Sequence, residues 1–172
     1  MKRRFYPKKS NLEKFNYMVN NNQKQGINLE PLVSFADENT TTADLCVAAA
    51  EKLFLDIDRT SIGALVFVTQ TPDYILPATS HVLQARLRLR NDVFCLDINE
   101  GCSGYVTGLY VSAMLAKQLN TRVCLLGGDT ISKLTLPVDR ATRCIFGDAG
   151  TATIIEAGEQ NVPFSFVSYG DR

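Results

Sequence analysis

The sequence predicts a layered α/β domain in which helices cover a mostly parallel sheet. Short apolar runs alternate with segments of helical periodicity, which is typical of parallel βαβ units. The run at residues 62–68 is apolar at successive positions, so we expect a strand that is buried on both faces. The chain has 172 residues, which is enough for one domain with a sizeable core.

The expected elements follow one another from residue 42 onward. Thr42 can cap a helix over residues 43–54, because a threonine side chain accepts a hydrogen bond from a first-turn amide. Pro77 suits the first turn of a second helix, since the amide hydrogen that proline lacks is not used there. The other expected elements are strands at residues 62–68, 93–98, 122–126 and 151–156, and a helix at 104–119.

The beginning of the chain differs from the rest in composition. We expect residues 1–40 to be a truncated first strand and a polar loop region, with a partial helix near residues 12–19, and residues 41–172 to be the domain that carries the site. The first 30 residues hold seven lysines and arginines against two glutamates. This basic segment could bind an acidic partner or a phosphate-bearing ligand, or it could be a solvated terminus.

Composition and cysteine spacing exclude several classes of protein. A net charge of zero argues against a nucleic-acid binder, and 45% hydrophobic residues argue against disorder. No apolar run is long enough to span a membrane, and no apolar region follows the basic residues at the start. The five cysteines form no Cys-x-x-Cys pair, so we expect no disulfide framework, no metal site and a reduced, cytoplasmic protein.

The segment from Asp97 to Tyr105 carries the chemistry. It places Cys102 between an expected strand and the following helix, where backbone amides at the helix start stabilise a thiolate. Gly101 and Gly104 leave space beside the sulfur. Cys102 is therefore a candidate nucleophile, with a buried structural thiol as the alternative. Glu100 could raise the pKa of the thiol by charge repulsion or serve as a nearby base.

Further motifs accompany this segment in order along the chain. They are Gly26-Ile27, Asp44-Leu45, Thr69-Gln70-Thr71-Pro72-Asp73-Tyr74, Gly127-Gly128-Asp129, Asp139-Arg140-Ala141-Thr142 and Phe146-Gly147-Asp148-Ala149-Gly150. Together with the turn around Cys102, they resemble the ketoacyl-acyl-carrier-protein synthase III family of thiolase-like condensing enzymes. The resemblance implies a thiolase-like fold of two similar halves. From this resemblance we expect the chain to correspond to the N-terminal half, with a mostly parallel sheet between helices and with the C-terminal half absent.

The resemblance also implies an activity and roles for five residues. Cys102 matches the nucleophile that takes an acyl group from a coenzyme A thioester, before condensation with malonyl-acyl carrier protein in fatty acid biosynthesis. Arg140 matches the arginine against the coenzyme adenine, and Lys24 falls near the coenzyme phosphates. Leu76 matches a residue that lines the acyl pocket across the interface of a homodimer, and Phe146 belongs to the active-site floor. No cofactor is implied beyond the coenzyme A thioester as substrate.

The sequence departs from the family pattern at several points. The family's catalytic histidine and asparagine lie in the second half, and the single histidine here, His81, matches neither, so we do not expect this chain to complete the condensation alone. Only residues 4–7 remain of a first strand that we expect at the centre of the sheet. Two alternatives stay open: a non-catalytic domain for dimerisation or for binding coenzyme A or acyl carrier protein, and a related polyketide or secondary-metabolite condensing enzyme.

Overall fold

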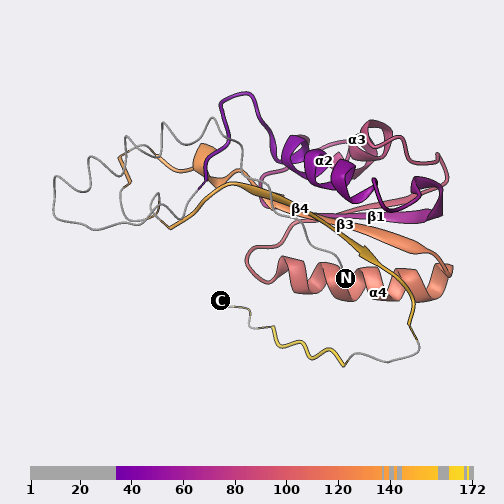
Figure 1. Cartoon of the computed structure of the whole chain (residues 1–172). Coiled ribbons are helices and arrows are strands. Elements are labelled where there is room, and N and C mark those ends of the chain that lie inside the picture. Colours follow the sequence, from indigo (N-terminus) through magenta and orange to yellow (C-terminus); the bar gives the residue numbers. More distant parts are fainter. Residues whose placement is uncertain are drawn as a thin grey trace.

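A computed structural model of the chain describes residues 34–136, 138, 139, 142, 145–158, 163–168 and 170. The described strands form one sheet in the order β2-β1-β3-β4 (Figure 1). The strands are β1 (Ile62–Val68), β2 (Phe94–Ile98), β3 (Arg122–Asp129) and β4 (Ala149–Ile155). β1 pairs in parallel with both β2 and β3, whereas β4 is antiparallel to β3. The predicted mostly parallel sheet is confirmed.

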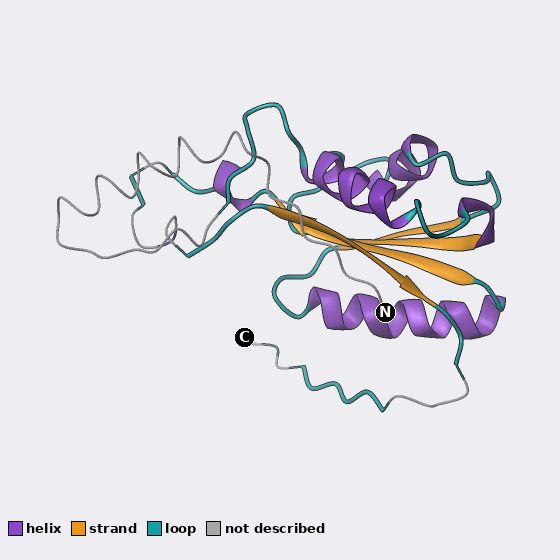
Figure 2. Ribbon diagram, in the orientation of Figure 1, coloured by secondary structure: helices purple, strands orange, loops and turns teal. Residues whose placement is uncertain are grey.

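Helices cover both faces of this sheet (Figure 2). α2 (Thr42–Leu53) and α3 (Thr79–Arg86) lie on one face, and α4 (Gly104–Leu119) lies on the other. The connection through α3 leads from β1 to β2, and the connection through α4 leads back across β1 to β3. These two connections run in opposite directions across the sheet. Because both are expected to be right-handed, they must pass over opposite faces, so α3 and α4 lie on different sides of the sheet.

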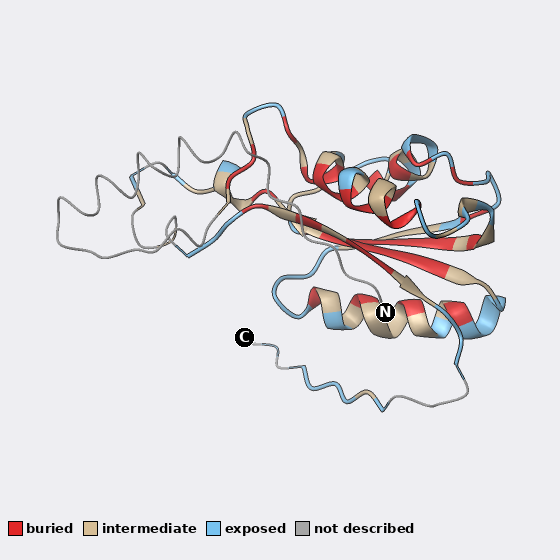
Figure 3. Cartoon of the chain, viewed as in Figure 1, coloured by how far each residue is buried: buried red, intermediate tan, exposed pale blue. Residues whose placement is uncertain are grey.

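The core consists of two layers, one on each face of the sheet. In β1, Leu65 and Phe67 pack toward α2 and α3, whereas Ala64 and Val66 pack toward α4, and all four are fully buried. This alternation explains why the strand is apolar at every position, because neither of its faces meets water. Figure 3 shows the buried residues concentrated in the strands and on the sides of the helices that face them.

Two glycines allow the helices to approach the sheet closely. A Cβ atom on Gly108 of α4 would lie 2.6 Å from Cγ2 of Val68, and one on Gly150 of β4 would lie 2.4 Å from the carbonyl carbon of Leu45 in α2. Real Cβ atoms do not come so near to other heavy atoms. Both helix-to-sheet contacts therefore depend on the missing side chain.

The cap of α2 is one residue earlier than predicted. The side chain of Thr41, rather than that of Thr42, accepts a hydrogen bond from the amide of Asp44, and the Asp44 carboxylate accepts one from the amide of Thr41. This reciprocal arrangement is a capping box. The Thr42 hydroxyl instead lies 2.7 Å from that of Thr71 and 3.0 Å from that of Thr130.

The start of α3 is also later than predicted. The helix begins at Thr79, with Ala78 as the residue before it, so Pro77 precedes the first turn instead of lying in it. Ala78 offers no side chain that could cap the helix. The carboxylate of Asp97 in β2 accepts the hydrogen bonds of the Thr79 and Ser80 amides in its place.

The expected central position of a first strand is wrong. β1 pairs directly with β2 and β3, and β3 pairs with β4, so the described sheet has no vacant place at its centre. Residues 4–7 and the partial helix near residues 12–19 lie outside the described residues. The division of the chain at residue 40 stays a prediction.

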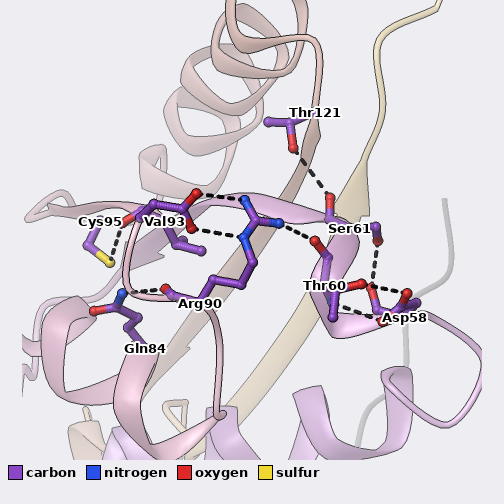
Figure 4. A network of polar contacts seen from close by, with 9 residues as sticks. Asp58, Thr60, Ser61, Gln84, Arg90, Val93, Cys95 and Thr121 are labelled. Carbon is purple, nitrogen blue, oxygen red and sulfur yellow. Dashed lines mark hydrogen bonds and ion pairs between the residues drawn. The ribbon is translucent and has the colours of Figure 1, made fainter.

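A polar network joins the segments at the amino ends of the parallel strands (Figure 4). Arg90 forms an ion pair with Asp92 at 2.8 Å and donates a hydrogen bond to the carbonyl of Thr60. Asp58 accepts a hydrogen bond from the amide of Thr60 and so caps the short 3-10 helix Arg59–Ser61. This network lies at the end of the sheet opposite to Cys102, and we assign it to stability.

Candidate active site

The carboxyl ends of three parallel strands meet at one edge of the sheet. β1 leads into Thr69 and Gln70, β2 leads into the turn that holds Cys102, and β3 leads into Thr130. Residues that follow parallel strands are gathered at such an edge, which is the usual position of ligand sites in open α/β sheets. The predicted nucleophile therefore lies where the fold favours a site.

Cys102 is exposed in the turn between β2 and α4. The amide of Gly104 donates a hydrogen bond to the carbonyl of Gly101 at 2.8 Å, which closes the turn around Cys102 and Ser103. α4 begins at Gly104, two residues after Cys102. Cys102 therefore directly precedes the N-terminal end of the helix, where the helix dipole is positive. The predicted strand–turn–helix placement of Cys102 is confirmed.

The other described cysteines are unsuited to nucleophilic chemistry. Burial raises the pKa of the Cys46 and Cys124 thiols to about 12, and that of the half-buried Cys95 thiol to about 11. These three thiols remain protonated at neutral pH, and a protonated thiol is a poor nucleophile. Among the cysteines that the structure describes, Cys102 alone is exposed. Cys144 lies outside the described residues.

Glu100 has a structural partner next to the turn. Its Oε2 accepts a hydrogen bond of 2.7 Å from the hydroxyl of Thr107, in the first turn of α4. A carboxylate is stabilised near the N-terminus of a helix, because the backbone amides there carry partial positive charge. The sequence left the role of Glu100 open, and this contact indicates that its carboxylate supports the start of α4.

Asp129, the last residue of β3, connects β3 to the segment that follows β1. Its Oδ1 accepts hydrogen bonds from the hydroxyl of Thr69 at 2.9 Å and from the amides of Gln70 at 2.7 Å and Thr71 at 3.2 Å. Its Oδ2 accepts a bond of 3.3 Å from Nε2 of Gln70. Sequence reasoning missed this network, because it requires the register of β1 against β3.

A second carboxylate, Asp148, is buried and joins three segments. It accepts hydrogen bonds from the amide of Ala36 at 2.8 Å, and from the amide and hydroxyl of Ser132 at 2.9 and 2.5 Å. Its own amide donates to the carbonyl of Ser34 at 2.7 Å. The charge is thus satisfied by polar donors, and the contacts fix the 3-10 helix Ile131–Lys133 beside the site.

A cavity of about 500 Å³ adjoins these strand ends. Its wall includes Thr41 at the start of α2, Gln70 and Thr71 after β1, Asn99 after β2 and Lys133. Cys102 is not part of this wall, but Asn99 precedes it by three residues. The cavity therefore lies beside the turn of the nucleophile.

The remaining predicted site residues have different outcomes. Arg140 and Lys24 lie outside the described residues. Leu76 is 88% exposed in the loop between β1 and α3, and Phe146 is 41% exposed just before β4. His81 is exposed on α3, on the face of the sheet opposite α4. The predicted roles of these residues stay predictions.

Comparisons with known proteins agree with this geometry. A family profile described as 3-oxoacyl-[acyl-carrier-protein (ACP)] synthase III matches residues 96–170. A Streptomyces coelicolor protein named beta-ketoacyl-[acyl-carrier-protein] synthase III 3 is 39% identical over 127 residues, 72% of this chain and 38% of that protein. A Paracoccus denitrificans protein named beta-ketoacyl-[acyl-carrier-protein] synthase III is 34% identical over 128 residues, 73% of this chain and 39% of that protein.

Solved structures show the same fold. The crystal structure of a 3-oxoacyl-(acyl-carrier protein) synthase from Burkholderia xenovorans LB400 has a TM-score of 0.74 and 40% identity, over 94% of this chain and 50% of that chain. The fold and the turn around Cys102 therefore define a thiolase-like α/β domain. The chain belongs to the 3-oxoacyl-[acyl-carrier-protein] synthase III family, and it matches an N-terminal part of its members.

The match covers only part of each relative. The chain spans 37 to 40% of the length of the first four curated relatives, all of which are named as synthases. None of the helices in the described part of the chain has both the length and the apolar composition needed to cross a membrane.

Proposed function

We propose that the chain carries the acyl-accepting site of a 3-oxoacyl-[acyl-carrier-protein] synthase III that acts in fatty acid biosynthesis. Sγ of Cys102 attacks the carbonyl carbon of an acyl-coenzyme A thioester. A new carbon–sulfur bond forms to Cys102, and the bond to the coenzyme sulfur breaks. Coenzyme A leaves as a thiol with the proton that Cys102 gives up.

The position of Cys102 carries this proposal. Its thiol is exposed at the carboxyl edge of the parallel sheet, directly before α4, whereas Cys46, Cys95 and Cys124 are wholly or partly buried with raised pKa values. The relatives named above are synthases that, by their names, act with acyl carrier protein. An exposed cysteine in this turn supports the transfer of an acyl group to sulfur.

The second step of the proposed reaction uses malonyl-acyl carrier protein. The malonyl group loses carbon dioxide, and the resulting carbanion attacks the carbonyl carbon of acyl-Cys102. A carbon–carbon bond forms, and the bond to Sγ breaks and returns the cysteine. This step needs hydrogen-bond donors for the developing negative charge. The single histidine of the chain, His81, lies on α3, which covers the face of the sheet opposite α4. We propose that the chain alone is acylated but does not condense.

We also propose that the chain forms a homodimer and that it contacts coenzyme A. Ile75 and Leu76 are 95% and 88% exposed, and side chains this apolar support a homodimer in which Leu76 reaches the acyl group of the partner. Phe146 is proposed for the active-site floor. Arg140 against the adenine and Lys24 near the phosphates rest on the sequence resemblance alone.

A two-substrate experiment tests both parts of the proposal. The purified chain is incubated with radiolabelled acetyl-coenzyme A, with and without malonyl-acyl carrier protein, and label is measured in the protein and in the β-ketoacyl product. We expect label in the protein and none in the product. Cys102→Ser should lose the label, and Cys95→Ser should retain it.

Two other outcomes contradict the proposal in different ways. A labelled product would contradict the claim that the chain does not condense alone. A protein that takes up no label contradicts the acyl-accepting role, and a non-catalytic binding or dimerisation domain is then favoured.

A further inference from the structure

The side chain of Gln70 lies between Asp129 and the turn of Cys102. The amide nitrogen of Gln70 donates to Oδ1 of Asp129 at 2.7 Å, and its Nε2 donates to Oδ2 of the same carboxylate at 3.3 Å. Asp129 is itself held by the hydroxyl of Thr69 and the amide of Thr71. The backbone and the carboxamide of Gln70 are therefore fixed by one anchored group.

This contact determines which end of the carboxamide faces the nucleophile. A carboxylate only accepts hydrogen bonds, so the NH2 group of Gln70 must face Asp129 and its oxygen must face away. A Cβ atom on Gly101 would lie 3.6 Å from this Oε1 and 3.8 Å from Cδ. The oxygen thus faces the residue directly before Cys102. Within the described part of the chain, Oε1 accepts no hydrogen bond, whereas the donors of Gln70 are used by Asp129.

Gln70 also lines the cavity that adjoins the turn of Cys102. Gln70 and Asn99 both belong to the cavity wall, and the turn of Cys102 follows Asn99. An acyl group that extends from Cys102 into this cavity would meet a hydrogen-bond acceptor held in one orientation. A group that offers a donor would satisfy it, whereas a group with only an acceptor would face a second acceptor.

We propose that Gln70 is a specificity-determining residue and that Asp129 is its positioning residue. Oε1 of Gln70 selects acyl groups that carry a hydrogen-bond donor near the thioester, such as a hydroxyl on the third carbon, over acyl groups with only an acceptor there. This inference rests on the acyl transfer to Cys102 proposed above.

The test compares acyl groups of the same length. The chain is incubated separately with 3-hydroxybutyryl-, acetoacetyl- and butyryl-coenzyme A, and the rate of mass increase on the protein is measured, with Cys102→Ser as blank. The hydroxyl group is a donor and the keto group only an acceptor, so we expect the 3-hydroxybutyryl rate to exceed the acetoacetyl rate about three- to tenfold, the effect of one hydrogen bond. Butyryl-coenzyme A carries neither group on the third carbon, so its rate is the reference by which the other two rates are divided for each variant.

Asp129→Asn should reverse the orientation of Gln70. The asparagine oxygen must still face the amides of Gln70 and Thr71, so its NH2 group faces the carboxamide of Gln70. Gln70 then turns its oxygen toward Asn and its NH2 group toward Gly101, and the acetoacetyl group gains a donor. We expect the ratio of the two rates to fall toward one or below.

Two further variants separate this effect from a general loss of structure. Gln70→Met keeps the length of the exposed side chain and removes both polar ends. The ratio of the 3-hydroxybutyryl rate to the acetoacetyl rate should therefore fall to about one in this variant. Asp92→Asn, at the opposite end of the sheet, should keep the wild-type ratio.

The outcomes that overturn the proposal are distinct. A wild-type ratio near one overturns the selectivity, and equal losses of both rates in Asp129→Asn, with the ratio retained, overturn the role of Asp129. If Asp129→Asn does not fold, Gln70→Met still decides the role of Gln70. Absence of transfer from every thioester contradicts the proposed function, and with it this inference.

Discussion

The carboxylate of Asp97 caps α3 from the neighbouring strand: its Oδ2 accepts a hydrogen bond of 2.7 Å from the amide of Thr79. Its Oδ1 accepts a second bond, of 2.8 Å, from the amide of Ser80. Asp97 belongs to β2 and precedes Cys102 by five residues. One side chain thus fixes both the start of α3 and the end of the strand that leads to the nucleophile.

Replacement of Asp97 by alanine should destabilise the fold. Asp97→Ala leaves two helix amides without their partner, so we expect the free energy of unfolding to fall by about 1–2 kcal/mol, as for other lost helix caps. Asp97→Asn keeps one acceptor and should lose less. Urea unfolding followed by circular dichroism measures both variants.

Ser80 provides the matched control for Asp97. Its hydroxyl is buried and, within the described part of the chain, has no hydrogen-bond partner. Ser80→Ala removes an unsatisfied polar group, so stability should stay unchanged or rise. A loss as large as that of Asp97→Ala would show that the account of the α3 start is wrong.

Gly108→Ala should separate α4 from the sheet. The new Cβ atom would lie 2.6 Å from Cγ2 of Val68 and 3.0 Å from Cδ1 of Leu125. Overpacking of this kind costs about 1–3 kcal/mol, against a gain of about 1 kcal/mol from the higher helix propensity of alanine. We expect a net loss in thermal unfolding. Gly158→Ala, where the structure leaves open space, should cause none.

The ion pair of Glu51 with Arg59 predicts a dependence of stability on pH. The hydrogen bond from Arg59, at 2.6 Å, lowers the pKa of Glu51 from its usual value of 4.5. A carboxyl group with a lowered pKa in the folded state stabilises that state above its unfolded pKa, and this contribution is lost as pH falls through the folded pKa. Glu51→Gln should therefore lose less stability than the wild type on acidification.

Urea midpoints at about pH 7 and about pH 3 measure this difference, since the window lies below the ordinary pKa of glutamate. The change in midpoint between the two conditions should be larger for the wild type than for Glu51→Gln. Equal changes would contradict a stabilising role of the ion pair.

The described cysteines should differ sharply in their reaction with iodoacetamide. Cys102 is exposed, whereas burial raises the pKa of Cys46 and Cys124 to about 12 and that of Cys95 to about 11. Peptide mapping at neutral pH should find Cys102 alkylated first among these four. Denaturation in urea should make the other three react. Early labelling of Cys46 or Cys124 in the folded protein would contradict the described core.

The sequence predicted the sheet well where the signal was local. β1 could be recognised because Ala64, Leu65, Val66 and Phe67 are all apolar, which indicates a strand without a solvent face. Cys102 could be placed because a strand, two glycines and a helix follow one another within a few residues. Both inferences depend on neighbours in the chain.

Features that depend on distant residues could not be predicted in the same way. The start of α3 is fixed by Asp97, which lies 18 residues beyond Thr79, so Pro77 gave a misleading signal. The contact of Gln70 with Asp129 spans 59 residues and requires the register between β1 and β3. For the cap of α2, two adjacent threonines were available, and only Asp44, three residues after Thr41, indicates the correct one.

The central claim is that Cys102 accepts an acyl group from coenzyme A thioesters. The most direct measurement is intact-protein mass spectrometry after incubation with acetyl-coenzyme A and longer acyl-coenzyme A thioesters, with Cys102→Ser in parallel. We expect one added acyl mass in the wild-type chain and none in the variant. A chain that gains no mass with any thioester, or a variant that gains the same mass as the wild type, would contradict the claim.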